Sequence, residues 1–233
     1  MKISIVSIAE IPLGKRNIKD HRLDEVDKIT KAKKKTYIQV DLVDEDAALD
    51  ADAILVAAES RADLILKDLE FVETRLSRNP PAEEKTILEK FKNSLEKEEL
   101  ASNVVLSEDE KKVISGYGLY TIKPVVAVKK EELEDVDALL ARALKESNYI
   151  SFFTTGEKET RAWLIRKGIS AWEAAGAIHS DIQKGFIRAE IISFADFISC
   201  GGETGAKQAG KLRLEQKDYV MQDTDLTNFR FNK

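Results

Sequence analysis

The sequence has 233 residues, enough for one large domain or for two to three small ones. It carries 37 Lys and Arg against 42 Asp and Glu, a formal net charge of −5, and 34% of its residues are charged. With 11 Gly and 4 Pro it is neither collagen-like nor of low complexity. The single cysteine, Cys200, excludes an intramolecular disulfide, and two histidines leave too few ligands for a Cys/His zinc site.

Nothing in the sequence predicts a membrane segment, because the longest apolar runs, such as 54–58, fall far short of the roughly 20 residues that cross a bilayer. The first residues lack the cleavage site of a signal peptide. We therefore expect a charge-rich globular protein of the reducing cytoplasm, without a membrane partner.

The first 60 residues alternate strand-like and helical patterns. Leu23, Val26 and Ile29 recur at helical spacing and precede a run of lysines over 31–35, which we assign to a solvated helix end. Runs rich in β-branched and apolar residues predict buried strands over 3–8, 37–43 and 53–58. This order predicts an α/β domain.

Two long amphipathic helices follow, separated by Asn79-Pro80-Pro81, where proline ends the first helix. Each helix places its apolar residues on one face, and these residues are Ile65, Leu69, Val72 and Leu76, then Leu88, Phe91 and Leu95. We predict an antiparallel helical hairpin. Ser107 and Glu110 then form a capping box, and a strand is expected over 120–128 before a helix over 136–144.

From Ile150 the pattern changes to aromatic-rich strands around one compact helix. Strands are predicted over 161–166 and 187–193, with shorter ones over 219–221 and 228–231, and a helix capped by Ser170 and Glu173 lies between the first two. This combination is typical of a small α+β module of the β-grasp kind.

A phosphate-loop-like run follows the first strand at 9–16. In the template G-x-x-x-x-G-K-[ST], glycines let the backbone N–H groups approach the phosphates, and the hydroxyl binds Mg²⁺. Gly14 and Lys15 match this template, but Ala9 replaces the first glycine, Arg16 replaces the hydroxyl residue, and Glu10 adds a negative charge. We expect no working nucleotide site here.

Other patterns that suggest chemistry have simpler explanations. The second glycine-rich run, 205–212, has leucine at the hydroxyl position and is predicted to be a loop. Cys200 with His179, and His179-Ser180-Asp181, do not have the arrangement of a catalytic triad. The acidic cluster at 41–46 is either a Mg²⁺ site or, as we predict, a solvated acidic turn.

Lys184-Gly185-Phe186-Ile187-Arg188-Ala189-Glu190 resembles the C-terminal TGS domain of the YchF/Obg-like ATPase family. The similarity continues from Ile150 to Phe231, including Gly205-Ala206-Lys207 and Phe229-Arg230-Phe231. The resemblance extends backwards through 63–70, which is similar to the start of the family's helical insertion, and through 106–111 to 123–125. It also reaches 22–24 and 33–34. Most of the chain therefore resembles this family, with large deletions.

The departures from the family pattern fall on the nucleotide site. The family's phosphate loop corresponds to 9–16, its acidic strand end corresponds to Asp44, and the segment for its first helix and first switch is absent. The resemblance therefore implies vestigial nucleotide-binding positions at Gly14, Lys15 and Asp44, with no catalytic residue, metal ligand or cofactor.

The fold class expected is α/β plus α+β: a reduced P-loop-like G-domain remnant over 1–58 and 115–148, a helical hairpin inserted over 59–114, and a TGS-like β-grasp domain over 149–233. The function expected is that of a non-catalytic regulatory module that binds the ribosome, RNA or a protein. The alternative is a weak residual ATP- or GTP-hydrolysing protein. The resemblance implies the ribosome or RNA partner, and a protein partner would bind the hairpin. The candidate contact residues are Lys184, Phe186, Arg188, Lys207, Lys211 and Arg213.

Overall fold

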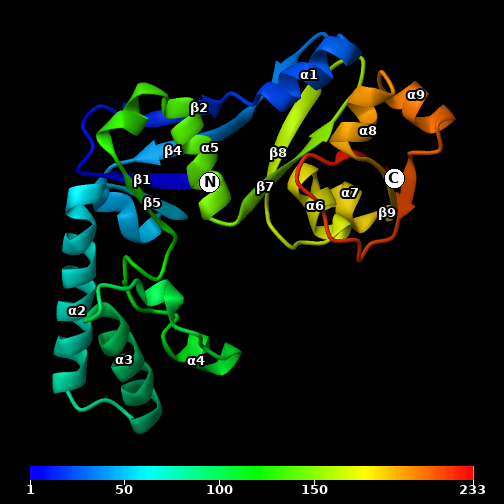
Figure 1. Ribbon diagram of the computed structural model, residues 1–233. Helices are drawn as coiled ribbons and strands as arrows, with labels where there is room; N and C mark the ends of the chain where they lie inside the picture. Colours follow the sequence, from blue (N-terminus) through cyan, green and yellow to red (C-terminus); the bar gives the residue numbers. More distant parts are fainter. Residues whose placement is uncertain (233) are drawn as a thin grey trace. The chain divides into compact units, whose positions relative to one another are not determined.

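The computed structural model describes residues 1–232 as two compact units, each with its own sheet (Figure 1). The N-terminal unit consists of Met1–Arg16 and Val40–Leu139. The C-terminal unit consists of Asn17–Gln39 and the chain from Leu140 onwards. Across residues 1–232, no helix is long and apolar enough to span a membrane.

The first sheet has the strand order β2-β4-β1-β5-β6. β1 pairs in parallel with both β4 and β5, and β5 pairs in parallel with β6. All five residues of β5 are buried, as expected for a central parallel strand that is covered on both faces. The strands of this sheet are β1 (Lys2–Val6), β2 (Gly14–Ile18), β4 (Ile38–Val43), β5 (Ala53–Ala57) and β6 (Val125–Val128).

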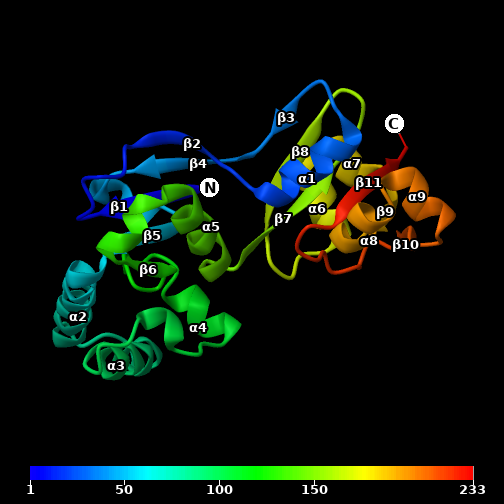
Figure 2. The same cartoon turned by 45° about the horizontal axis from the view of Figure 1, so that its top comes forward.

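Two helices, α2 (Arg61–Ser77) and α3 (Ala82–Leu95), lie side by side after β5 (Figures 1 and 2). α2 ends just before Asn79-Pro80-Pro81, the break predicted from the prolines. Their facing sides form a core with the segment that leads to β6. The buried residues of this core are Ile65, Val72, Ile87, Leu88, Phe91, Leu95, Ala101, Ile114 and Leu119.

Asp68 ties α2 to that returning segment. Its carboxylate is 1% exposed and accepts hydrogen bonds from the backbone N–H groups of Tyr120 (2.8 Å) and Thr121 (2.7 Å) and from the Thr121 hydroxyl (2.6 Å). Thr121 Oγ1 in turn accepts from the backbone N–H of Ala101 at 3.1 Å. Burial raises the pKa of Asp68 above its ordinary value, although these hydrogen bonds act against that change.

The remaining helices of the N-terminal unit are short. The capping box predicted at Ser107 and Glu110 is confirmed, with both reciprocal hydrogen bonds formed. These elements are the 3₁₀ helices Glu45–Asp50, Ala58–Ser60, Ala101–Asn103 and Lys130–Glu134, α4 (Glu108–Val113), and α5 (Val136–Glu146), which continues past the unit boundary.

The sheet of the C-terminal unit has the strand order β10-β9-β11-β7-β8-β3. β7 pairs antiparallel with β8, and β9 pairs antiparallel with both β10 and β11, whereas β3 pairs in parallel with β8 at one edge. The strands are β3 (Lys35–Thr36), β7 (Tyr149–Thr154), β8 (Thr160–Arg166), β9 (Phe186–Ile192), β10 (Arg213–Glu215) and β11 (Leu226–Phe231).

Helices cover both faces of this sheet. Phe152 and Ile165 pack against α6 (Ala171–Ile178), whose buried alanines allow close approach to the strands. Phe153 points to the opposite face and is also fully buried. The remaining helices of this unit are α1 (His21–Thr30), α7 (Ser180–Lys184), α8 (Phe194–Ser199) and α9 (Glu203–Gln208).

Helix α1 lies over the second face, where it contacts β8 and α8 (Figure 2). Its buried residues are Leu23 and Val26, and its last residue, Thr30, hydrogen-bonds the Thr160 hydroxyl at 2.8 Å. Gly202 has a φ of +115°, and a Cβ there would lie 2.9 Å from Ile29 Cγ2. Only glycine fits that close approach without strain.

Several features differ from the sequence predictions. Residues 17–39 belong to the C-terminal unit, whereas we had assigned them to an α/β domain over 1–58. The strand expected over 120–128 is only β6, because Asp68 takes the N–H groups of Tyr120 and Thr121. The run 205–212 contains the end of α9 instead of a loop throughout, and 219–221 contributes one isolated β-bridge, through Val220.

The Asp68 contacts generate a testable prediction. In Asp68→Asn the side chain offers one acceptor oxygen in place of two and turns an NH₂ group towards buried donors, so the free energy of local opening should fall by about 1–3 kcal/mol. Amide hydrogen exchange at Ala101, Tyr120 and Thr121 should then quicken by about 5- to 150-fold. Glu70→Gln removes an exposed carboxylate from the same helix and should leave these rates unchanged. Equal amide exchange rates in Asp68→Asn and Glu70→Gln would show that the hydrogen bonds of Asp68 do not stabilise this segment.

Candidate functional site

The run that matches a phosphate loop in sequence does not form one in the structure. Gly14 begins strand β2 with a φ of +109°, and Lys15 follows it in the strand with an exposed side chain. A phosphate loop needs a helix directly after the lysine, because the free N–H groups at the helix N-terminus bind the anion. Here a strand takes the place of that helix. Arg16, at the hydroxyl position, forms an ion pair with Asp137 at 3.1 Å.

Asp44, the expected acidic position, lies just after β4 and is exposed. Its carboxylate accepts a hydrogen bond from the backbone N–H of Ala47 at 3.3 Å and so caps the 3₁₀ helix Glu45–Asp50. Its backbone carbonyl accepts from the Ser4 hydroxyl at 2.9 Å. In residues 1–232, no group of three or more His, Cys, Asp or Glu residues is arranged to hold a metal ion.

Sequence reasoning missed the role of Lys123. Its ammonium donates to the backbone carbonyl oxygens of Ala48 (3.2 Å), Ala51 (2.8 Å) and Leu49, at the C-terminal end of the same 3₁₀ helix. A cation is favourable there because the carbonyl groups at the C-terminal end of a helix carry partial negative charge. Burial lowers the pKa of Lys123 below its ordinary value, against the attraction of Asp50 and Asp52. No local pattern around Lys123-Pro124 signals this contact.

Three of the six expected contact residues in the C-terminal unit have acidic partners. Lys207 pairs with Glu203 at 2.5 Å, one helical turn away, and Lys211 pairs with Asp196 at 3.2 Å. Arg213 pairs with Glu215 at 3.1 Å. The segment 207–213 that contains these three residues has no acidic residue, but carboxylates from outside the segment lie against each of them.

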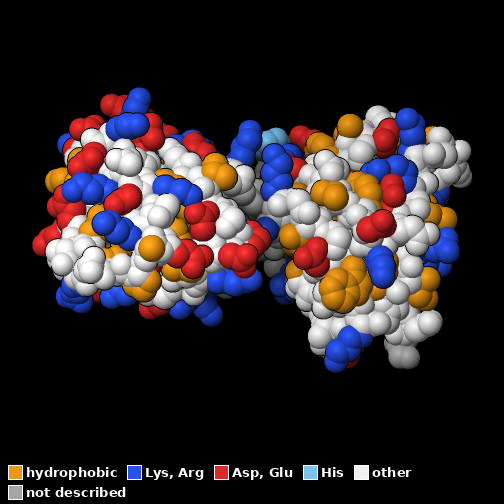
Figure 3. Space-filling model, turned by 90° about the horizontal axis from the view of Figure 1, so that it is seen from below, with side chains coloured by type: hydrophobic (Ala, Val, Ile, Leu, Met, Phe, Trp, Pro, Cys, Tyr) orange, Lys and Arg blue, Asp and Glu red, His pale blue; other side chains and the backbone are white. Residues whose placement is uncertain are grey.

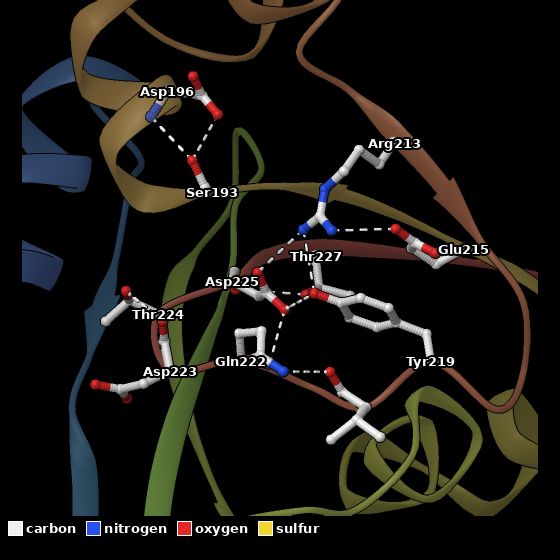
Figure 4. A network of polar contacts seen from close by, with 11 residues as sticks. Ser193, Asp196, Arg213, Glu215, Tyr219, Gln222, Asp223, Thr224, Asp225 and Thr227 are labelled. Carbon is white, nitrogen blue, oxygen red and sulfur yellow. Dashed lines mark hydrogen bonds and ion pairs between the residues drawn. The ribbon is translucent and has the colours of Figure 1, made fainter.

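Arg213 is also part of a larger polar network (Figure 4). It donates to the Tyr219 hydroxyl at 3.1 Å and lies 3.6 Å from Asp225, which in turn accepts from Tyr219 Oη and from the backbone N–H of Gln222, both at 2.9 Å. The Asp225 side chain is 3% exposed, and burial raises the pKa values of both Asp225 and Tyr219. This network holds β10 against the segment before β11.

Phe186 packs inwards against Phe229, with ring centroids 5.9 Å apart. The adjacent Gly185 is needed for packing, since a Cβ there would lie 2.1 Å from the Asn232 carbonyl oxygen. Lys184 and Arg188 are exposed and have no ion-pair partner within residues 1–232. Of the expected contact residues, these two present an uncompensated charge.

The division of the chain into units also separates its charge. The N-terminal unit has 16 Lys and Arg against 26 Asp and Glu, a net −10, and Figure 3 shows acidic and basic side chains interspersed over its visible face. The C-terminal unit has 21 against 16, a net +5, because residues 17–39 bring a surplus of lysines. Without residues 17–39 the surplus is small, since residues 151–233 have only 12 Lys and Arg against 11 Asp and Glu.

Comparison with known proteins agrees with this architecture. The family model YchF-GTPase_C, described as a protein of unknown function (DUF933), matches residues 149–232. The chain is 32% identical over 235 residues to the ribosome-binding ATPase YchF of Bacillus subtilis, covering 73% of this chain and 64% of that protein. It is 37% identical over 202 residues to the protein of the same name from Haemophilus ducreyi, covering 64% of this chain and 56% of the relative.

The chain thus spans less than two thirds of the length of either relative. The alignment with the Bacillus subtilis protein is 235 residues long but includes only 73% of this chain, so this chain has gaps within the alignment. Parts of the Bacillus subtilis protein therefore have no counterpart here. The structure of the Schizosaccharomyces pombe YchF GTPase superposes with a TM-score of 0.78 at 20% identity, over 99% of this chain and 97% of that one, and shows the same fold. Taken together, these matches show that the chain belongs to the YchF family.

Proposed function

We propose that this protein associates with ribosomes through RNA and acts there as a regulatory binding module without nucleotide hydrolysis. The observation that carries the proposal is the separation of charge, because a net +5 on the C-terminal unit attracts polyanions while the net −10 of the N-terminal unit opposes indiscriminate binding. The names of the two relatives, ribosome-binding ATPases, support the choice of the ribosome. A cytoplasmic location is part of this proposal.

The loss of nucleotide binding is the second part of the proposal. The geometry of β2 supports it, because Gly14 and Lys15 lie in a strand and Arg16 is bound to Asp137. Asp44 serves as a helix cap. Asp44 and Arg16 thus form contacts within the fold that differ from Mg²⁺ ligation, and Lys15 is exposed in a strand.

The third part concerns the domains. We interpret the C-terminal unit as a TGS-like β-grasp domain to which residues 17–39 are added, and the sheet of the N-terminal unit as the remnant of a G domain. The helices α2 and α3 are interpreted as a helical hairpin inserted into this remnant. In this interpretation the first helix and the first switch of the G domain are absent, and residues 17–39 pack in the C-terminal unit instead.

The first prediction for this function concerns nucleotides. Isothermal titration calorimetry with ATP or GTP and Mg²⁺ should show no binding tighter than about 100 µM, equivalent to roughly −5.5 kcal/mol. A tighter, Mg²⁺-dependent signal that disappears in Lys15→Ala and in Asp44→Ala would contradict the proposal. That result would establish the residual ATPase in its place.

The second prediction concerns the ribosome. The protein should sediment with purified ribosomes at low salt without added nucleotide, and rising salt should release it, because counterions compete with phosphate contacts. The same sedimentation without ribosomes controls for aggregation of the protein. Protein that stays in the supernatant at every salt concentration would reject ribosome association, and capture that survives complete RNase digestion would indicate a protein partner.

The third prediction concerns Lys184 and Arg188. The double variant Lys184→Ala/Arg188→Ala removes two unpaired charges and should be released from ribosomes at a lower salt concentration than the parent. Lys207→Ala/Lys211→Ala removes the same charge from residues that already have acidic partners, and should be released close to the parent's midpoint. Equal midpoints for all three proteins would remove Lys184 and Arg188 from the interface.

A further inference from the structure

We propose that residues 31–36 and 157–161 together form a basic ridge that binds the phosphate backbone of RNA. The inference rests on the proposed function and names the surface that would make the main contact. The basic ridge consists of the cationic side chains of Lys31, Lys33, Lys34, Lys158 and Arg161.

Backbone hydrogen bonds build the ridge from two segments that are far apart in the sequence. Lys31 ends α1 in the left-handed conformation, with a φ of +51°, and turns the chain towards β8. The Lys33 N–H then donates to the Glu157 carbonyl at 3.1 Å, and the Thr160 N–H donates to the Lys34 carbonyl at 2.9 Å. The parallel pairing of β3 with β8 continues this contact, so the lysines of both segments lie along one edge of the sheet.

Most of this charge is not neutralised locally. Lys34 and Arg161 share one acid, Glu159, at 3.4 and 4.0 Å. Lys31, Lys33 and Lys158 are exposed and have no ion-pair partner in the described part of the chain, residues 1–232. The five cations of the ridge stand against two glutamates in the same segments, a net +3, whereas each cation of the cluster Lys207, Lys211 and Arg213 has an acidic partner. The sixth cation of the two segments, Lys35, pairs with Asp24 at 2.5 Å and is not part of the ridge.

An aromatic group beside the ridge favours a nucleic acid over other polyanions. The Arg161 guanidinium lies 4.0 Å from the centroid of the Trp163 ring, and Trp163 Nε1 donates to Thr154 Oγ1 at 2.9 Å, which fixes the ring. A planar cation stacked on an indole presents a flat outer face on which a base can stack. A surface that inserts into an acidic membrane has exposed apolar side chains beside its lysines, and none of the exposed large hydrophobic residues found in 1–232 lies within 31–36 or 157–163.

Lysines at a sheet edge have one other known use, which is to prevent pairing with a second chain. The ridge extends beyond that role, because Lys158 and Lys31 lie outside the two-residue strand β3. The proposal is therefore distinguishable from edge protection by direct binding measurements.

The test uses fluorescein-labelled RNA, as a 20-nucleotide oligouridine and as a 20-base-pair duplex, titrated with the full chain over a salt series. The slope measured is that of the logarithm of the binding constant against the logarithm of the salt concentration. Lys33→Ala/Lys158→Ala should reduce the magnitude of this slope by about 1.4 on the single strand and about 1.8 on the duplex, because two phosphate contacts are lost. The charge-matched control Lys207→Ala/Lys211→Ala should keep the parent's slope. Thermal unfolding of each variant verifies that the fold is retained.

Equal slopes for the parent and Lys33→Ala/Lys158→Ala would overturn the ridge and leave edge protection as the role of these lysines. Absence of RNA binding by the parent at 50 mM salt would overturn it as well. The two proposals fail separately, since a parent that binds RNA through the ridge but does not sediment with ribosomes would reject only the ribosomal function. A ridge variant that keeps the parent's RNA salt slope while the parent sediments with ribosomes would reject only the ridge.

Discussion

The pairing of residues 31–36 with 157–161 is the interaction on which the organisation of this chain depends. The backbone bonds at Lys33 and Lys34 connect segments more than 120 residues apart, and they fix α1 over the second face of the C-terminal sheet. Burial of Leu23 and Val26 against that face adds the apolar contribution that a two-residue strand cannot supply alone. Because of this pairing, residues 17–39 complete the C-terminal unit, and their lysines change its net charge to +5.

The inclusion of residues 17–39 in the C-terminal unit also determines how the chain of the N-terminal unit continues after β1. In a nucleotide-binding domain the first strand leads through a loop into a helix, and the helix N-terminus holds the phosphates. Here the chain after β1 enters β2, and the next helix, α1, belongs to the other unit. Polar groups left at the ends of the parallel strands are used for structure: Asp44 caps a 3₁₀ helix, and Lys123 binds its last carbonyl groups. These contacts stabilise the ends of the parallel strands in the N-terminal unit.

The charge that is free to meet a partner depends on which carboxylates lie close to each cation in the folded chain. Lys207, Lys211 and Arg213 lie in a segment without acid, yet Glu203, Asp196 and Glu215 neutralise them. Phe186, next to a glycine, packs against Phe229. The lysine run over 31–35 was visible in the sequence as a solvated helix end, but the pairing of its segment with the segment that contains Lys158 follows only from the sheet edge. Surface predictions from composition therefore fail here wherever a helix turn or a strand pair brings in an opposite charge.

The sequence by itself determined the features that depend on residues within about four positions of one another. These include the capping boxes at Ser107 and Ser170, the helix end before Pro80, the buried strand β5 and the defective phosphate-loop pattern at 9–16. The tertiary structure alone decided which unit contains 17–39, that Gly14–Ile18 is a strand, that Asp68 replaces strand pairing at Tyr120, and which lysines stay unpaired. The physical reason is that the first three outcomes are set by backbone and side-chain hydrogen bonds between residues tens to more than a hundred positions apart, which no local pattern records. The pairing of each lysine depends on where its side chain and the nearby carboxylates lie in the folded chain.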